Sequence, residues 1–301
     1  MYNINILVCS DKNYIMPTAV LLKSLSFNIC SNDKSKYKLT TYILNSDLSD
    51  GDIKNIENIV NEKNIKILSL KINEEDFKGL KVSGHISKSA YYRILASEVL
   101  PDNIDRVLYL DCDIIINGSI KDFYFQDFDG KALIACEDKV ISHNDLEVYK
   151  NLNLDINDKY FNSGVILFNI ELLRQIPDFK SKMFNFINDN KENFIFHDQD
   201  ILNGFFKDKV KFDDDFIYNN LVKWIRNRKE LKEAYKNTVI FHYADRWKPW
   251  KYNYIGYCDD LFWKYACMAG YNEFYKEYKR KHFIYKFIPF NILRKIKRLV
   301  F

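Results

Sequence analysis

The sequence predicts an α/β fold in which helices cover both faces of a mostly parallel sheet. Apolar runs at 4–9, 38–44 and 65–70 have the length of buried strands, and segments of helical length separate them. Strands that alternate with helices in this way form parallel sheets, because each connecting helix packs back onto the sheet. With 301 residues and 47% hydrophobic content, the chain can bury a core in one large domain or in two small ones.

The first half of the chain alternates regularly between strands and helices. The strand at 4–9 is followed by a helix with Pro17 near its first turn. The strand at 38–44 precedes a helix with apolar residues at positions 53, 56, 59 and 60, and the strand at 65–70 follows that helix. A further helix opens near His85 and stops at Pro101.

The second half continues the pattern less regularly. Residues 131–136 are predicted to form a strand, and the polar segment 138–160 a loop or short helices that could serve as a lid. Residues 161–169 are predicted to contain a turn of small residues followed by a buried strand. Residues 171–190 are predicted to be helical. The strand at 238–242 ends at a histidine.

The segment 105–117 carries the strongest chemical signal. An apolar run stops at two carboxylates one residue apart, Asp111 and Asp113, and three isoleucines follow. In a strand, residues i and i+2 share a face, so we expect the two carboxylates to converge. A divalent cation with oxygen ligands would stabilise such a pair, whereas a plain strand-end turn would leave it in solvent. Both interpretations stay open on this segment alone, because Asp-x-Asp also occurs at 50–52, 127–129, 198–200 and 213–215, and most such pairs are expected to be solvated loop carboxylates.

Other polar residues lie at predicted strand and helix ends. Asp11 and Asn13 follow the first strand, and such sheets bind ligands beyond the carboxyl ends of their strands. A strand-end histidine is usually structural, but His242 is also a candidate third metal ligand beside the two aspartates. Arg93 is either a phosphate or sugar contact or the partner in a structural ion pair. Asp198 is either a site residue or an ordinary helix N-cap.

Composition excludes several classes of protein. Six cysteines, none in a Cys-x-x-Cys spacing, favour neither a zinc knuckle nor a disulfide framework and fit a reduced, cytoplasmic protein. The first ten residues lack the basic flank and apolar region of a signal peptide. No apolar run approaches the roughly 20 residues that a membrane-spanning helix needs.

Charge is unevenly distributed along the chain. Residues 276–301 contain nine Lys or Arg and one acid, a charge of +8 in a chain of net charge +4, which leaves −4 for the rest. The mildly acidic body argues against a nucleic-acid partner. On a helical wheel, the apolar residues within 292–300 share one arc and the basic residues lie opposite. The tail is therefore predicted to bind an anionic membrane surface through 276–301, with a helix docked on the protein as the alternative.

Six short segments together resemble glycosyltransferase family 8. In chain order they are 8–14, 85–87 with 91–93, 107–113, 160–164, 198–203, and His242 with 248–250. Each segment alone is a weak signal, and the six at compatible spacings are a specific one. The resemblance covers about residues 3–255. The family includes bacterial lipopolysaccharide galactosyl- and glucosyltransferases and, more distantly, glycogenin.

The resemblance implies the GT-A fold, a Rossmann-like nucleotide-binding half merged with an acceptor-binding half in one domain. We expect this domain at 1–265 and the basic tail at 266–301. The implied reaction moves glucose or galactose from a UDP-hexose donor to a glycan or glycolipid acceptor, with retention at the anomeric carbon. Asp111, Asp113 and His242 would hold Mn2+, or less favourably Mg2+, and the metal would neutralise charge on the departing UDP.

The family pattern also implies the donor site and the chemistry. Lys248 would place a second positive charge near the leaving diphosphate. Gln199 is a poor nucleophile, so with Asp198 beside it we favour same-face attack by the acceptor hydroxyl, with the carbonyl oxygen of Gln199 stabilising the developing cation. The residues implied to contact the donor are Cys9, Asp11, Asn13, Tyr14, His85, Arg93, Asp111, Cys112, Asn162, Gly164, Asp198, Gln199 and Lys248.

The segment after His242 departs from the family pattern. Family members often carry Gly three residues after this histidine, and this chain has Asp245 followed by Arg246. An acid near a diphosphate repels it unless the acid points away or pairs with Arg246. We therefore expect donor placement to differ in detail at this point.

Three functions are compatible with these features. The leading one is a retaining hexosyltransferase that builds lipopolysaccharide or another cell-surface polysaccharide from the inner face of the cell membrane. A glycogenin-like self-glucosylating protein is the second, and the 21 tyrosines do not discriminate because they are spread along the chain. A catalytically silent, membrane-associated scaffold is the third. Against it stands the intact set of Asp111, Asp113, Gln199, His242 and Lys248.

Overall fold

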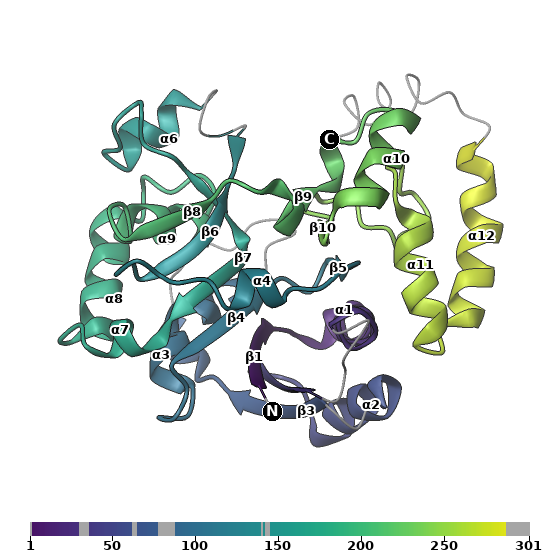
Figure 1. Cartoon of the computed structure of the whole chain (residues 1–301), viewed down its shortest axis with the longest axis horizontal. Coiled ribbons are helices and arrows are strands. Elements are labelled where there is room, and N and C mark those ends of the chain that lie inside the picture. Colours follow the sequence, from purple (N-terminus) through teal and green to yellow (C-terminus); the bar gives the residue numbers. More distant parts are fainter. Residues whose placement is uncertain are drawn as a thin grey trace.

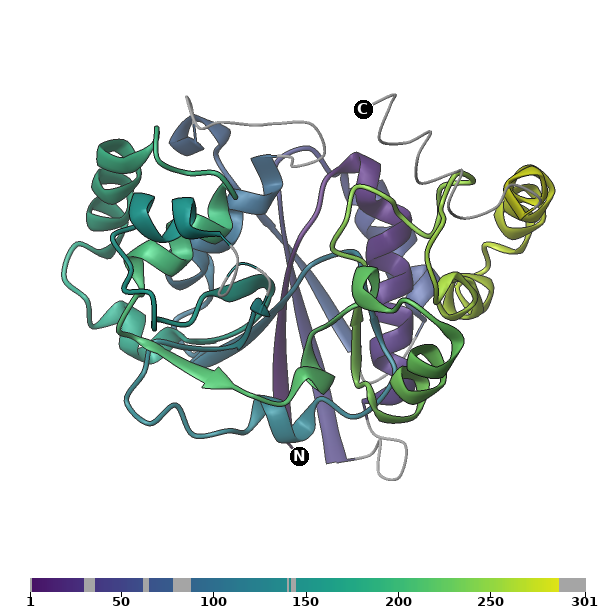
Figure 2. The same ribbon diagram turned by 90° about the horizontal axis from the view of Figure 1, so that it is seen from above.

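A computed structural model describes residues 2–29, 36–61, 65–77, 88–139, 141 and 145–286. A large twisted sheet forms the centre of this part of the chain, and helices lie on both of its faces (Figure 1). The view from above separates the layers, with the long first helix on one side of the sheet and the helices of the middle of the chain on the other (Figure 2). The predicted α/β class is confirmed.

The large sheet has seven strands. They are β1 (Tyr2–Cys9), β2 (Tyr37–Asn45), β3 (Ile65–Lys71), β4 (Arg106–Leu110), β6 (Leu133–Glu137), β7 (Phe161–Asn169) and β8 (Val210–Asp213), in the order β3-β2-β1-β4-β7-β6-β8. Six strands point the same way, and β7 runs antiparallel to its neighbours β4 and β6. The carboxyl ends of six strands therefore meet the start of β7 at one edge of the sheet.

Two hydrophobic clusters cover the faces of this sheet, because the strands are apolar on both sides. Along β1, Ile4, Ile6 and Val8 join one cluster, and Leu7 and Cys9 join the other. The first cluster includes α1 (Ile15–Asn28), α2 (Asp50–Val60) and α4 (Lys121–Tyr124). The second includes η4 (Lys88–Leu95), α3 (Ala96–Val99), α7 (Ile170–Arg174), α8 (Phe179–Asn190) and α9 (Asp198–Phe205).

A second, three-stranded sheet lies beside the large one and leads to the C-terminal helices. It contains β5 (Ile114–Ile116), β10 (Ile240–His242) and β9 (Asn220–Leu221) in that order. Its apolar side chains pack in a third cluster with α10 (Arg228–Asn237), α11 (Asp259–Met268) and α12 (Asn272–Lys286). Short elements complete the described residues: η1 (Lys12–Tyr14), η3 (Glu74–Phe77), α6 (Leu146–Asn151), η5 (Phe216–Tyr218) and η6 (Val222–Trp224).

The described part of the tail is docked on the protein. On α12, the hydroxyl of Tyr278 donates to Asp259 Oδ2 at 2.9 Å, and its ring lies 4.8 Å from that of Trp263 on α11. The boundary expected between 265 and 266 falls inside α11, so that division of the chain stays a prediction. Residues 287–301, which hold the predicted amphipathic segment, lie outside the described residues. No helix in the described ranges is both long and apolar enough to cross a membrane.

Two local predictions were wrong. Residues 162–164 were expected in a turn, but they are the buried start of β7. Residues 171–190 form two helices, because the chain breaks at Pro177 and Asp178 adopts a left-handed conformation with φ of 53°. The segment 138–160 contains one short described helix, α6, as expected.

Candidate active site

Asp111 and Asp113 lie in the connection between the two sheets. They were expected to converge as neighbours on one strand face, but β4 ends at Leu110 and the chain turns before β5 begins in the other sheet. Backbone hydrogen bonds hold this turn from both sides, because Asp111 N donates to Gly164 O at 2.9 Å and Tyr243 N donates to Asp113 O at 3.0 Å. The carboxylates converge because two sheets meet here.

His242 completes the cluster from the end of β10. This strand pairs with β5 so that His242 lies opposite Ile114, the residue after Asp113. His242 Nε2 lies 3.5 Å from Asp111 Oδ2 and 3.3 Å from Asp113 Oδ1. One ligand atom from each residue lies within 4.8 Å of the others, so the three predicted ligands are close enough to share one cation.

The donor set of this cluster fits a divalent metal. Asp113 Oδ1 and His242 Nε2 are buried and make no hydrogen bond within the described residues. The other ring nitrogen, His242 Nδ1, lies 2.9 Å from Asn219 Oδ1, and donation to that oxygen leaves a lone pair on Nε2. Buried polar atoms without partners are costly, so the geometry favours an additional positive group between them.

The electrostatics of the cluster lead to the same conclusion. Burial by itself would raise the pKa of Asp113, but Lys248 and His242 outweigh it and hold that pKa below its ordinary value. Burial would lower the pKa of His242, but Asp113 and Asp111 outweigh it and raise that pKa. Burial would also raise the pKa of Asp111, but Arg93 outweighs it and holds that pKa below its ordinary value. Both carboxylates are thus ionised at neutral pH and favour positive charge beside them.

Lys248 is one source of that positive charge. Its Nζ forms an ion pair with Asp113 and donates to Tyr243 O at 3.0 Å. The side chain is buried at the wall of the cleft, where water screens its charge weakly. The predicted role of Lys248 near a leaving diphosphate stays a prediction, because its partner in this structure is a carboxylate of the cluster.

Arg93 joins the cluster to a third carboxylate. It forms ion pairs with Asp111 at 3.0 Å and Asp198 at 3.2 Å, and it donates to Ser163 O at 2.6 Å. Burial would lower the pKa of Arg93, but the two carboxylates outweigh burial and raise it. The structural ion pair considered from the sequence is present.

Asp198 is buried in the wall of the same cleft. It is the first residue of α9, whose N-cap is His197, so the alternative of Asp198 as a helix cap was wrong. Burial raises the pKa of Asp198 to about 6, although Arg93 opposes the shift. Asp200 is buried as well and accepts from Tyr160 at 2.5 Å, so 198–200 is not one of the solvated Asp-x-Asp pairs.

Gln199 organises the start of β7. Its Oε1 accepts hydrogen bonds from Asn162 Nδ2 at 3.1 Å and from Ser163 N at 3.0 Å. Both lone pairs of this oxygen are therefore used, so its predicted role beside a developing cation stays a prediction that needs one of these bonds to open. Gly164 makes room for the imidazole, because a Cβ there would lie 2.2 Å from His242 Cε1.

A cleft of about 540 Å³ surrounds these groups. Nine of the residues predicted to contact the donor line it: Cys9, Tyr14, Arg93, Asp111, Cys112, Asn162, Asp198, Gln199 and Lys248. Burial raises the pKa of Cys9, and raises that of Cys112 to about 12, so both thiols are neutral.

Asp11, Asn13 and Gly164, which were also predicted to contact the donor, lie outside the lining of the cleft. Asp11 Oδ1 accepts from Asn13 N at 2.8 Å and caps η1, while its Oδ2 lies 3.5 Å from the hydroxyl of Ser89 at the cleft wall. Gly164 lies behind the metal cluster. His85 falls outside the described residues. Asp245 lines the cleft together with Arg246.

Two functional residues were missed in the sequence. Asn219 orients His242 and also donates to Asn162 Oδ1 at 3.0 Å, so it connects the metal cluster with the start of β7. Tyr109 donates to Asp111 Oδ1 at 2.5 Å, and its ring lies 4.1 Å from the guanidinium of Arg93. The position of Tyr109, two residues before Asp111, could have predicted its contact with that carboxylate. No sequence motif around Asn219 could have predicted its contact with His242.

Comparison with solved structures defines the class of protein. The crystal structure of galactosyltransferase LgtC in complex with donor and acceptor sugar analogues matches with a TM-score of 0.74 and 24% identity, over 87% of this chain and 95% of that chain. The mixed α/β domain is therefore a GT-A fold, as predicted.

Comparison with families and curated relatives identifies the chain further. The model of glycosyl transferase family 8 matches residues 5–254, and the chain belongs to this family of sugar-transferring enzymes. It is 26% identical to General stress protein A of Bacillus subtilis (strain 168) over 267 residues, 83% of this chain and 88% of the relative. It is 28% identical to a lipopolysaccharide 1,2-glucosyltransferase of Escherichia coli over 283 residues, 90% of this chain and 80% of the relative. The predicted family is confirmed.

Proposed function

We propose that the chain is a retaining hexosyltransferase that moves glucose or galactose from a UDP-sugar to a hydroxyl of a glycan or glycolipid. A divalent cation bound by Asp111, Asp113 and His242 takes part. The observation that carries this proposal is a pair of buried atoms at the wall of the cleft, Asp113 Oδ1 and His242 Nε2, which make no hydrogen bond to any described residue. Relatives named for lipopolysaccharide sugar transfer favour lipopolysaccharide or another cell-surface polysaccharide as the product.

The donor atoms favour Mn2+ over Mg2+, because one imidazole joins two carboxylates and Mg2+ prefers oxygen ligands and water. When bound, the cation supplies Lewis-acid stabilisation of the diphosphate. Lys248 adds a fixed positive charge at the cleft wall, in a site that water screens weakly. Arg93 holds Asp111 and Asp198 in place and prevents repulsion between them.

The transfer breaks the bond between the anomeric carbon and the β-phosphate oxygen, and the electron pair leaves with UDP. The acceptor hydroxyl forms the new bond on the same face, and its proton passes to the departing phosphate oxygen. Gln199 and Asp198 lie beside the donor sugar and stabilise positive charge at the anomeric carbon. A double displacement would instead need a carboxylate nucleophile, for which Asp198 is the nearest candidate.

Screening UDP-glucose, UDP-galactose and their N-acetyl analogues for metal-dependent hydrolysis tests the proposal. We expect one UDP-hexose to be hydrolysed in Mn2+ and not in EDTA, with loss of this activity in Asp113→Asn. Proton NMR of the released sugar should show the anomeric configuration of the donor. An absence of hydrolysis for every donor in Mn2+, together with no binding of UDP, would favour the silent scaffold.

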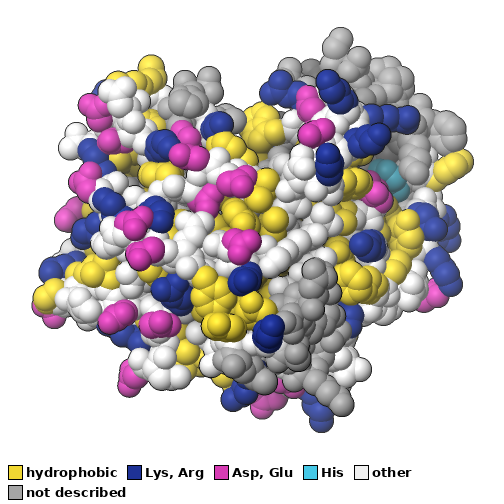
Figure 3. Space-filling view, viewed as in Figure 1, with side chains coloured by type: hydrophobic (Ala, Val, Ile, Leu, Met, Phe, Trp, Pro, Cys, Tyr) yellow, Lys and Arg dark blue, Asp and Glu magenta, His cyan; other side chains and the backbone are white. Residues whose placement is uncertain are grey.

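We also propose that the enzyme works at the inner, cytoplasmic face of the membrane. The described α12 exposes Lys276, Lys279, Arg280 and Lys281, and Figure 3 shows Lys and Arg side chains gathered along this edge of the molecule. Four further basic residues occur within 294–298. Each basic residue near an anionic surface contributes about 1 kcal/mol to binding.

Truncation after Lys286 tests the membrane proposal and keeps the packed α12 intact. Sedimentation with vesicles containing phosphatidylglycerol should fall at least tenfold, while UDP binding stays unchanged. Equal sedimentation of the full and truncated chains would show that residues 287–301 do not anchor the protein.

A further inference from the structure

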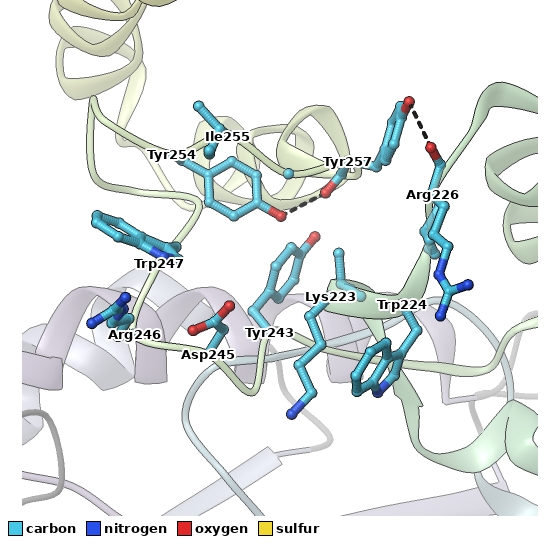
Figure 4. Close-up of a pocket in the computed structure, with 13 residues that line it drawn as sticks. Lys223, Trp224, Arg226, Tyr243, Asp245, Arg246, Trp247, Tyr254, Ile255 and Tyr257 are labelled. Carbon is cyan, nitrogen blue, oxygen red and sulfur yellow. Dashed lines mark hydrogen bonds between the residues drawn. The ribbon is translucent and has the colours of Figure 1, made fainter. Parts of the chain in front are cut away.

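A second cavity, of about 640 Å³, adjoins the donor cleft. It is lined by residues 222–226, 243, 245–247 and 254–257, which come from η6 and the two residues after it, the segment that follows β10, and the segment before α11 (Figure 4). Lys223, Asp245 and Arg246 line both the cavity and the cleft. The volume of this cavity is typical of small-molecule binding sites. A ligand bound in it would therefore lie next to the donor cleft.

Positive charge dominates the lining of this cavity. Three cations, Lys223, Arg226 and Arg246, accompany one acid, Asp245. Lys223 Nζ and Arg226 Cζ lie 5.3 and 6.0 Å from the ring centroid of Trp224, so both cations are grouped around one indole. Within the described residues neither cation has a carboxylate partner within 4.0 Å. Their hydrogen-bond donors are available to an anionic ligand.

Aromatic side chains supply the remaining wall. Trp224 is 39% exposed and lines the cavity, so its indole is accessible to a ligand. Opposite it, Tyr254 donates to Tyr257 O at 2.7 Å, and Tyr257 donates to Arg226 O at 3.4 Å, as Figure 4 shows. These bonds join the segment before α11 to the segment that carries the cations, so the wall is largely preformed.

We propose, on the basis of the function proposed above, that this cavity is the acceptor subsite for an anionic saccharide. A phosphate or carboxylate group of the acceptor binds Lys223 and Arg226, and a sugar ring packs on the exposed indole of Trp224. The acceptor hydroxyl that forms the new glycosidic bond then points into the adjoining cleft, and its proton leaves with UDP. The anionic group itself takes no part in bond making.

The position of Arg226 argues against the donor as its ligand. The donor's diphosphate is assigned to the cluster of Asp111, Asp113 and His242, whereas Trp224 and Arg226 line the second cavity and not the cleft. Lys223, Asp245 and Arg246 stand where the two cavities join, so Lys223 can reach an anion that lies in the second cavity beside Arg226. An acceptor whose charge lies away from the reacting hydroxyl satisfies both constraints.

Acceptor competition with the full-length enzyme tests this inference. The wild type is supplied with the UDP-hexose that it hydrolyses and with three sets of glycosides: phosphorylated, uronic acid-containing and neutral, with the same sugar skeleton. We expect kcat/KM to be at least tenfold higher for one charged set than for the neutral set. The set that is preferred distinguishes phosphate from carboxylate.

Arg226→Gln and Trp224→Ala are the test variants, and Arg228→Gln is the matched control. Arg228 carries the same charge two residues further along the chain and lies outside the lining of both cavities. Arg226→Gln should lower the charged-to-neutral ratio of kcat/KM about tenfold or more, chiefly through KM. Trp224→Ala should raise KM for both sets. Arg228→Gln should leave the ratio within twofold.

The outcomes separate this inference from the function on which it rests. An enzyme that hydrolyses a UDP-hexose but uses neutral and charged acceptors equally would overturn the inference and leave the proposed function standing. An unchanged ratio in Arg226→Gln would overturn it as well. Failure to hydrolyse or bind any UDP-sugar would overturn the proposed function itself, and the inference with it.

Discussion

Replacing Gly164 by alanine places one methyl group in the ligand cluster. The added Cβ would lie 2.2 Å from Cε1 and 2.9 Å from Nδ1 of His242, and 2.8 Å from Asp111 Oδ2. Carbon atoms pack at about 3.5–4.0 Å, so something has to move by more than about 1 Å. Gly164 sits in β7, hydrogen-bonded into the centre of the large sheet, so we expect the imidazole to move rather than the backbone.

That displacement is large on the scale of metal coordination. Metal–ligand distances vary by about 0.2 Å, so a shift of the ring by about 1 Å removes His242 from the site. We expect the affinity for UDP in Mn2+ to fall about 100-fold or more, which is the upper end of the loss when a supporting partner is removed. The free energy of unfolding should also fall, by about 1–3 kcal/mol, because the core is overpacked.

Calorimetric titration of UDP in the presence of Mn2+ measures the first effect, and urea unfolding measures the second. Gly51→Ala is the control, because its Cβ would meet nothing closer than Ser49 Oγ at 3.6 Å. A folded Gly164→Ala variant that binds UDP in Mn2+ within twofold of the wild type would refute the reasoning.

Three further predictions concern the buried charges. Arg93→Met leaves Asp111 and Asp198 without their cation, so the free energy of unfolding at pH 7 should fall by about 3–5 kcal/mol in urea, and a loss below 1 kcal/mol would contradict the ion-pair geometry. In Asp200→Asn, an NH2 group replaces one of the carboxylate oxygens that accept hydrogen bonds from Tyr160 and the backbone, so a donor faces a donor. The free energy of unfolding should therefore fall by about 1–3 kcal/mol in the same assay. Because the pKa of Asp198 is raised to about 6 in the folded protein, protonation of Asp198 stabilises the folded state. This contribution to the free energy of unfolding should be lost as the pH rises through about 6. If the carboxylate is the active form, kcat/KM should rise through about pH 6 in saturating metal, and Asp198→Asn should lack this step.

Much of the fold could be predicted because periodicity reports local structure. The apolar runs at 4–9, 38–44 and 65–70 correspond to β1, β2 and β3, and the expectation that helices cover both faces matched the two-sided burial of β1. Residues 162–164 were assigned to a turn because Asn, Ser and Gly favour turns. In the structure, Gly164 leaves space for the imidazole of His242, which comes from a strand far away in the sequence. No local sequence pattern around Gly164 could show that this space is required.

The candidate site was predictable in its membership and less so in its geometry. The family segments located Asp111, Asp113 and His242, and the structure brings them together. The apolar residues before and after the carboxylates looked like one strand, although β4 and β5 belong to different sheets. Asn219, which orients His242, was missed because its role depends on how the chain returns to the cluster.

The central claim is that Asp111, Asp113 and His242 collect a divalent cation that is needed to bind the nucleotide. Measuring the unfolding free energy with UDP, in Mn2+ and in EDTA, tests this claim directly, with His282→Ala on α12 as a histidine control. In Mn2+, UDP at 100 times its Kd should stabilise the wild type and the control by about 2.7 kcal/mol, and the gain should vanish in EDTA and in His242→Ala. Equal stabilisation by UDP with and without the metal would contradict the account.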